Sequence, residues 1–253
     1  MNAHRKIAVA GATGRVGRHV VDVLTTRGHD VVAMSRAGRV DLITGAGLAD
    51  ALTDVEILVD TATGSSPDQQ QATEFFTTAA AHLHAAGEKA GVQRIVEVSI
   101  INADRYSAGY SAAKVAHEQA MLAGPVPVSI LRAAQFHELV DLLMMWGRQG
   151  EVVYVPTMRF QPIAARTVAE ALADLALAPG ADGTIPEIAG PREESAADLA
   201  RLLASRRGDP VRIEEVNDPT DPDRRLEATG GLLPGPQATL AGPTFAEWLD
   251  TTS

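Results

Sequence analysis

Three residues near the middle of the chain have the types and spacing of a proton-transfer site: Ser99, Tyr110 and Lys114. Ser99 ends an apolar segment typical of a buried strand, and Tyr110 begins a predicted helix 11 residues later. Tyr110 and Lys114 are four residues apart, so both lie on one face of that helix. An ammonium beside a phenol favours the phenolate form. We expect Tyr110 to donate a proton to a carbonyl oxygen, with Ser99 bonded to the same oxygen.

A glycine-rich segment, residues 7–17, predicts the partner for this chemistry. A short apolar strand ends in Gly11-x-x-Gly14-x-x-Gly17, and an amphipathic helix follows at once. Gly11 permits a sharp turn, Gly14 lets the backbone approach a pyrophosphate, and Gly17 lets the helix pack against the strand. Free N–H groups at the start of the helix attract phosphates. The segment therefore predicts a dinucleotide site, the alternative being a purely structural glycine turn.

The end of the second predicted strand indicates which dinucleotide binds. NAD-selective sites place Asp or Glu about 20 residues beyond the glycines, where it accepts hydrogen bonds from the ribose 2′-hydroxyl. Here the strand ends in Ser35 and Arg36, with Arg39 close behind and no carboxylate before Asp41. Arginine suits a 2′-phosphate because of its fixed charge and forked donors, and Arg15 can add to the same pocket. We expect NADP (NADPH), the alternative being that these arginines are solvated surface residues.

The first half of the chain alternates apolar, β-branched segments with helical ones. Strands are expected at 6–10, 30–34, 56–60, 94–98 and 128–132, and helices at 15–27, 47–52, 69–90 and 109–122. This alternation predicts an α/β fold, a doubly wound, Rossmann-like parallel sheet with right-handed crossovers.

The pattern changes after residue 135. We divide the chain into a dinucleotide-binding core, 1–135, and a small C-terminal substrate lobe, 136–253, that completes the same globular unit. The lobe is expected to contain helices at 137–148, 166–177 and 195–207 and strands at 151–156, 184–189 and 211–216. Residues 217–243 contain two Asp-Pro pairs and much glycine, which predicts loop with short turns.

Composition narrows the class of protein. The 253 residues contain no cysteine, which excludes disulfides, thiolate metal sites and a cysteine nucleophile. A formal net charge of -10 argues against a nucleic-acid partner. No apolar run approaches the ~20 residues that span a bilayer, so we expect no membrane association and a cytoplasmic location. His82 and His84 point to different faces of one helix, and we expect no metal site. The expected partner is a small-molecule substrate, and the expected state is a monomer or homodimer.

Together, Gly-Ala-Thr-Gly-x-x-Gly, the strand-terminal serine, Tyr-x-x-x-Lys and the later Leu-Arg-Ala-Ala-Gln-Phe (131–136) resemble the short-chain dehydrogenase/reductase superfamily. Within it, the chain is most similar to the atypical, NmrA-like or NAD(P)H-binding branch, most strongly over residues 6–136. The resemblance implies cofactor contacts in the glycine loop, beside the adenine and along the ribose and nicotinamide. These contacts, with the residues considered above, fall on Gly11, Ala12, Thr13, Gly14, Arg15, Val16, Gly17, Ser35, Arg36, Asp41, Leu42, Thr61, Ala62, Thr63, Lys114, Ala133 and Phe136.

The resemblance implies an NADP-dependent oxidoreductase that reduces a small carbonyl or related unsaturated compound. Members of this branch also include NADP-binding regulators that have lost the active-site residues, so an NADP-sensing regulator is the alternative. The chain retains Ser99, Tyr110 and Lys114, which favours an enzyme. A sugar-nucleotide epimerase is a weaker third reading, because 253 residues leave little room for a larger substrate lobe. The segment Asp60–Gly64 departs from the Asn-Asn-Ala-Gly signature of the larger branch.

Overall fold

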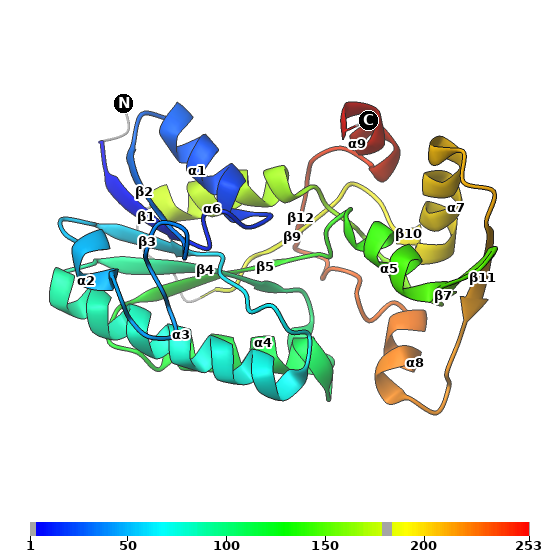
Figure 1. Ribbon diagram of the computed structural model, residues 1–253, viewed down its shortest axis with the longest axis horizontal. Helices are drawn as coiled ribbons and strands as arrows, with labels where there is room; N and C mark the ends of the chain where they lie inside the picture. The colour runs from blue at the N-terminus through cyan, green and yellow to red at the C-terminus, as the bar shows by residue number, and fades with distance from the viewer. Residues whose placement is uncertain (1–3, 179–183, 253) are drawn as a thin grey trace. The chain divides into compact units, whose positions relative to one another are not determined.

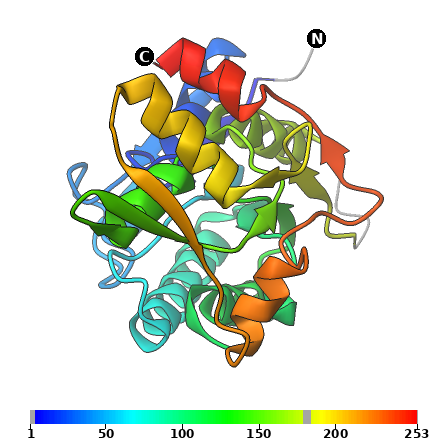
Figure 2. The ribbon, with the colours of Figure 1, turned by 90° about the vertical axis from the view of Figure 1, so that its right-hand side faces the viewer.

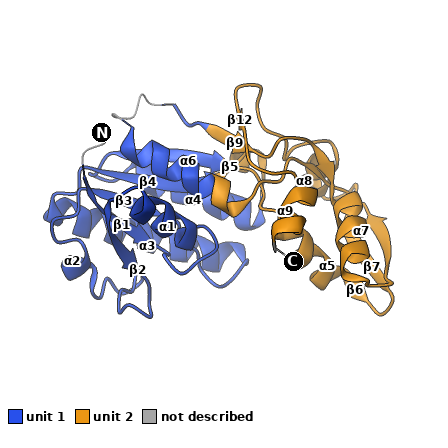
Figure 3. Cartoon of the chain, turned by 90° about the horizontal axis from the view of Figure 1, so that it is seen from above, with its two compact units in different colours: residues 1–99, 108–132, 168–186 blue, residues 100–107, 133–167, 187–253 orange. Residues whose placement is uncertain are grey.

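The computed structural model describes residues 4–178 and 184–252, and the chain divides into two compact units (Figure 3). Unit 1 comprises residues 1–99, 108–132 and 168–186, and unit 2 comprises residues 100–107, 133–167 and 187–253. Each unit is therefore assembled from three separate segments of the chain, and each is described by itself below.

Parallel strands form the centre of unit 1. They are β1 (Lys6–Ala10), β2 (Asp30–Met34), β3 (Ile57–Asp60), β4 (Arg94–Ile100) and β5 (Val128–Ala133). Their hydrogen-bonded order is β2-β1-β3-β4-β5, and β1 pairs in parallel with both β2 and β3. In this order the direction of winding reverses between β1 and β3. Open α/β sheets bind ligands in the crevice outside the carboxyl ends of the strands at such a point.

Helices cover both faces of this sheet (Figure 1). In that view α1 (Gly17–Thr26) and α6 (Ala165–Leu177) lie above the sheet, and α3 (Gln69–Ala90) and α4 (Gly109–Leu122) lie below it. Asp68 caps α3 by accepting a hydrogen bond from the Gln71 N–H, and Gly91 ends the helix in the left-handed conformation. This arrangement confirms the predicted doubly wound, Rossmann-like fold.

The apolar residues of β1, β3, β4, α3 and α4 explain why these elements pack. Ala8, Leu58, Ile95, Leu83 and Met121 belong to one cluster and are fully buried. Their strands are apolar on both faces, as expected of a parallel sheet with helices on either side. Two buried carboxylates are exceptions, Glu97 within β4 and Asp60 at the end of β3.

Unit 2 is built around a small sheet of its own, which can be followed in Figure 2. Strand β7 (Val152–Pro156) pairs in parallel with β11 (Arg212–Val216) and antiparallel with β6 (Arg148–Gln149). Helices α5 (Leu139–Gly147) and α7 (Ala196–Arg207) pack against β7. The remaining elements are η1 (Ala103–Arg105), β8 (Arg159–Phe160), β9 (Glu187–Ala189), β10 (Glu194–Ser195), α8 (Pro222–Ala228), β12 (Thr239–Leu240) and α9 (Phe245–Thr252).

The structure of residues 217–243 differs in part from the prediction. The expectation of loop with short turns is wrong for Pro222–Ala228, which form α8. The Asp221 carboxylate accepts hydrogen bonds from the N–H groups of Asp223 and Arg224, and Pro222 occupies the first helical turn. An Asp-Pro pair is thus a helix start here, because proline has no N–H that the first turn would leave unsatisfied.

Two smaller differences concern element lengths. The helix expected at 47–52 is the single turn α2 (Leu48–Ala51), and the strand expected at 184–189 is assigned only as β9, Glu187–Ala189. Within the described segments, none of the helices has both the length and the apolar character needed to cross a membrane.

Candidate functional site

The glycine turn between β1 and α1 has the geometry that its sequence predicts. Gly11 has φ +72°, and a Cβ there would lie 2.8 Å from the Ala62 Cα. A Cβ on Gly17 would lie 2.2 Å from the Gly11 carbonyl oxygen. Side chains at these two positions would therefore collide with backbone. Gly14 donates its N–H to the same Gly11 oxygen at 2.8 Å, which closes the turn.

A cavity of about 340 Å³ opens beside this turn within unit 1. Ten of the predicted cofactor residues line it: Gly11, Thr13, Gly14, Ser35, Arg36, Asp41, Leu42, Thr61, Ala62 and Thr63. Three further loop residues, Ala12, Val16 and Gly17, are instead buried behind the turn. Arg15 and Arg39 are exposed and lie outside the lining of this cavity. The structure thus brings together residues from the ends of three strands, as the resemblance implies.

The rim after β2 combines one cation with one tightly held carboxylate. Arg36 is exposed and lines the cavity. The Asp41 carboxylate accepts hydrogen bonds from the N–H groups of Ile43 at 2.7 Å and Thr44 at 3.0 Å. These bonds, led by that of Thr44, lower the pKa of Asp41. Asp41 therefore stays ionised and fixes the turn that carries Leu42 along the cavity.

Tyr110 is tied to the wall of this cavity. Its phenol oxygen lies 2.8 Å from Thr63 Oγ1, in a hydrogen bond that links α4 to the segment after β3. The Tyr110 ring packs edge-on against Phe76 of α3, with 5.7 Å between ring centroids. Ser99 of β4 is only 3 % exposed, and its hydroxyl oxygen has no hydrogen-bond partner among the described residues. Buried hydroxyls are normally satisfied, so an unpartnered one is a candidate ligand contact.

Lys114 differs from expectation. We expected its ammonium beside the Tyr110 phenol, yet it donates hydrogen bonds to Glu97 Oε1 at 2.9 Å and the Val98 carbonyl at 2.8 Å, and it lies 2.8 Å from His117 Nδ1. The ammonium also lies 4.7 Å from the centroid of the Phe76 ring, which contacts Tyr110 as well. Lys114 and Tyr110 therefore share a helix face and an aromatic neighbour, but the lysine charge is paired with a carboxylate.

Ala133 and Phe136 belong to unit 2 and are described there. Ala133 ends β5, is 2 % exposed and accepts a hydrogen bond from the Ile101 N–H at its carbonyl. Phe136 is half-buried and forms an isolated parallel bridge with Ile163. Their predicted place beside a nicotinamide stays a prediction.

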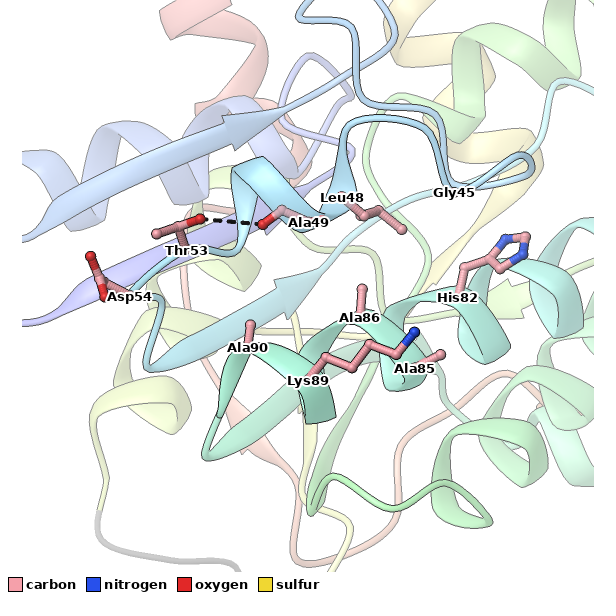
Figure 4. Close-up of a pocket in the computed structure, with 10 residues that line it drawn as sticks. All are labelled: Gly45, Leu48, Ala49, Thr53, Asp54, His82, Ala85, Ala86, Lys89 and Ala90. Atoms are coloured by element: carbon pink, nitrogen blue, oxygen red, sulfur yellow. Dashed lines mark hydrogen bonds between the residues drawn. The ribbon is translucent and has the colours of Figure 1, made fainter.

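A larger cavity, about 530 Å³, lies elsewhere in unit 1 (Figure 4). It is lined by Gly45, Leu48, Ala49, Thr53, Asp54, His82, Ala85, Ala86, Lys89 and Ala90, chiefly from α2 and α3. None of these is a predicted site residue, and half of them are glycine or alanine. The smaller cavity, with the glycine turn and Arg36 in its lining, is the one suited to a dinucleotide.

Sequence reasoning missed several residues of the site. Gly64, Ser65 and Phe75 also line the smaller cavity. Asp60, Glu97 and His117 form a buried charged group with Lys114. A signal was present for Glu97, because a carboxylate within an apolar parallel strand must find a buried partner. His117 follows Lys114 by three residues, which places both on one helix face.

The similarity of this chain to known proteins indicates which ligand the site binds. Residues 11–138 match the model of a protein family described as NAD(P)H-binding, a range that contains the glycine turn, Arg36, Tyr110 and Lys114. The chain belongs to this NAD(P)H-binding family. The match confirms the predicted resemblance and a nicotinamide dinucleotide as the family's ligand. No curated protein is significantly similar to this chain in sequence.

Solved structures share the fold of this NAD(P)H-binding protein. One is a dTDP-4-dehydrorhamnose reductase from Bacillus anthracis in complex with NADP, with a TM-score of 0.73, 15% identity and 98% of each chain covered. An NADPH-dependent quinone oxidoreductase from Escherichia coli has a TM-score of 0.70 and 18% identity, over 97% of this chain and 99% of that one. A short-chain dehydrogenase/reductase superfamily protein from Agrobacterium tumefaciens with bound NAD has a TM-score of 0.70 and 20% identity, over 97% and 95%.

Proposed function

We propose that the protein is an NADP-dependent oxidoreductase that reduces a small carbonyl or related unsaturated compound, with Tyr110 as the proton donor. The observation that carries the proposal is the hydrogen bond between Tyr110 and Thr63, because it joins an acid–base group to the lining of the dinucleotide cavity. The reductases among the similar structures, which bind NADP or NADPH, support the same class of reaction.

The residues present fit the dinucleotide. A side chain at Gly11 or Gly17 would collide with backbone, and the N–H groups of the turn and of the first turn of α1 suit a pyrophosphate. Arg36 is placed on the cavity wall after β2, where its guanidinium would pair with a 2′-phosphate. Thr61, Ala62 and Thr63 would then line the ribose and nicotinamide side. This assignment favours NADP over NAD.

The chain's own groups supply the acid–base half of the reaction. Bound NADPH would provide the hydride for the substrate carbon. The Tyr110 hydroxyl donates its proton to the substrate oxygen, and Thr63 Oγ1 holds the phenol in place. The buried, unpartnered Ser99 hydroxyl is the second group that we propose to bind this oxygen. The ammonium of Lys114 is paired with Glu97, so we assign it to supporting α4 and the electrostatics around Tyr110.

Turnover tests the proposal. The purified protein is mixed with NADPH and a panel of aldehydes, ketones, enones and quinones, and oxidation of NADPH is followed by absorbance. We expect oxidation with at least one member of the panel and slower oxidation of NADH. Absence of NADPH binding by calorimetry would overturn the dinucleotide assignment. Tight NADPH binding without its oxidation in the presence of any compound would overturn the proposed reductase activity. The assignment of NADPH as the ligand would then still stand.

One observation favours the second candidate, an NADP-sensing regulator. The enzyme hypothesis expects Lys114 beside Tyr110, but the Lys114 ammonium contacts Glu97 and His117 instead. A regulator needs only the dinucleotide cavity. Binding of NADPH in this cavity would change the affinity of the protein for a partner protein. The distinguishing measurement is affinity capture from cell extract with and without NADPH. A partner that is retained in only one of the two states, together with no turnover, would decide for the regulator.

A further inference from the structure

Four ionisable side chains are buried together in unit 1, and the proposed reaction explains only one of them. Asp60 ends β3, Glu97 lies within β4, and Lys114 and His117 lie three residues apart on α4. Their exposed fractions are 1%, 0%, 4% and 1% respectively. Charged residues are almost never buried to this extent unless they are paired. The cluster therefore needs a structural or functional reason.

His117 is the centre of this cluster. Its Nδ1 lies 2.8 Å from Glu97 Oε1 and 2.8 Å from Lys114 Nζ, and its Nε2 lies 3.3 Å from Asp60 Oδ2. The Phe76 ring stacks on the imidazole with 4.5 Å between centroids. The imidazole thus bridges a carboxylate of β4 and a carboxylate of β3 while an aromatic ring excludes water from one face.

The charges of the cluster balance only when His117 carries a proton. Two carboxylates and one ammonium leave a net charge of -1, and a protonated imidazole cancels it. Only the protonated ring has an N–H at both nitrogens, so only that form faces both carboxylates with donors. Burial and the Lys114 charge act to lower the pKa of His117, but its contacts with Asp60 and Glu97 outweigh them and raise it.

Asp60 connects this cluster to the dinucleotide cavity. Its Oδ1 accepts a hydrogen bond from the Ala62 N–H at 2.9 Å, while its Oδ2 lies 3.3 Å from His117 Nε2 as an ion-pair contact and has no hydrogen-bond partner among the described residues. Ala62 lines the cavity, as do its neighbours Thr61 and Thr63. One oxygen of Asp60 therefore holds the cavity wall, and the other faces the His117 imidazole in an ion-pair contact.

We propose that His117 is a positioning residue for the dinucleotide: by bridging Asp60 to Glu97 and Lys114 it fixes the Thr61–Thr63 wall of the cavity, so that its protonation and cofactor affinity are linked. The inference rests on the proposed function, because it takes the smaller cavity to be the NADPH site. When His117 loses its proton, its Nδ1 can accept a hydrogen bond from the Lys114 ammonium, and its Nε2 then faces Asp60 without a positive charge. The wall then loses part of its support and NADPH binds less tightly.

Replacement of His117 tests this linkage. NADPH dissociation constants are measured by fluorescence titration from about pH 6 to about pH 9 for the wild type and His117→Gln. The matched control is His84→Gln. His84 is also buried, at 4 % exposed, but lies on α3 and bonds to the Met121 carbonyl. Ionisation of NADPH and of the other histidines contributes equally to the pH profiles of all three proteins. A difference between the profiles therefore reports on the substituted histidine.

The wild type should lose affinity as pH rises through the pKa of His117, and His117→Gln should lack this component. At the acidic end the variant should bind about 5- to 50-fold more weakly, within the range of typical coupling between sites. His84→Gln should keep the wild-type profile even if its unfolding temperature falls. A merely structural role would lower the stability of both variants and leave both pH profiles unchanged. That result, or wild-type affinity in His117→Gln, would overturn the inference.

A second measurement uses only the wild-type protein, so it tests the inference even if His117→Gln does not fold. In wild-type protein with labelled histidines, the pKa of His117 is followed by NMR with and without NADPH. Linkage is reciprocal, so binding must raise this pKa, and an unchanged value would overturn the inference alone. If the wild type binds no NADPH at any pH, the proposed function fails as well, which separates the two outcomes.

Discussion

The hydroxyls of Thr63 and Tyr110 lie 2.8 Å apart, although the residues are 47 positions apart in the chain. Thr63 belongs to the segment after β3 and Tyr110 to the first turn of α4. The bond places the phenol at the wall of the cavity that the glycine turn opens. In the reaction that we propose, this bond rather than Lys114 would hold the phenol in place.

Tyr110→Phe removes this hydroxyl and keeps the ring packing against Phe76. NADPH binding should persist, while kcat on a substrate found in the panel should fall about 10²- to 10⁴-fold, the range typical of general acid catalysis. Tyr154→Phe, on β7 of unit 2, is the matched control and should retain the wild-type rate. Equal turnover by Tyr110→Phe and wild type would show that Tyr110 only packs.

Arg36→Ala tests the choice of dinucleotide. If Arg36 pairs with the 2′-phosphate, calorimetry should show an affinity for NADPH about 10- to 100-fold lower, with little change for NADH. Arg39→Ala is the control, since Arg39 is exposed outside the lining of the cavity. Losses of the same size for both cofactors, or equal affinities in the wild type, would contradict the phosphate assignment.

Local signals explain how much of the fold is predictable from the sequence. The helix Gln69–Ala90 is alanine-rich and ends at Gly91, and its predicted and observed bounds agree. Helix α8 was missed because an Asp-Pro pair serves equally as a turn and as a helix start, and only the capping bonds of Asp221 distinguish them. The glycine turn was predictable because the apolar strand residues and the three glycines that signal it all lie within residues 7–17.

The buried charges show what sequence patterns do not contain. The spacing of Tyr110 and Lys114 places both on one helix face, but a third residue on that face, His117, and two residues of β4, Glu97 and Val98, decide where the ammonium points. Asp60 and Glu97 meet α4 only through the order of the strands in the sheet. The partners of the Lys114 ammonium therefore depend on tertiary contacts that helix spacing does not contain. This is why the expected contact between the ammonium and the Tyr110 phenol is not observed.

Gly14→Val tests the pyrophosphate site. A Cβ at Gly14 would lie 3.0 Å from the Gly11 carbonyl oxygen, a tight contact but the only one within 4 Å and far less severe than that at Gly17, so we expect the fold to survive. The branched side chain would occupy the place of the phosphate, and NADPH binding should be lost. Gly17→Ala is the contrasting variant, because its Cβ would lie 2.2 Å from the same oxygen and should destabilise the fold. A folded Gly14→Val protein, judged by circular dichroism, that binds NADPH normally would place the site elsewhere.

Lys114→Met should destabilise the protein by about 3–5 kcal/mol, because it leaves the buried Glu97 without its ammonium partner. The double variant Lys114→Met/Glu97→Gln should recover part of this loss, since it removes the uncompensated charge. Urea denaturation measures both free energies of unfolding. A Lys114→Met protein as stable as the wild type would show that the pair contributes nothing.

The same pair predicts how stability depends on pH. Burial acts to raise the pKa of Glu97, but the charge of Lys114 and the contact with His117 outweigh it and lower the pKa. The stabilisation is therefore present above the unfolded value of about 4.3 and is lost as pH falls through the lower folded value. In urea denaturation across this acidic range, Glu97→Gln should show a shallower fall in the free energy of unfolding than the wild type. Glu74→Gln, an exposed substitution on α3, should keep the wild-type slope, and equal slopes for all three proteins would contradict the prediction.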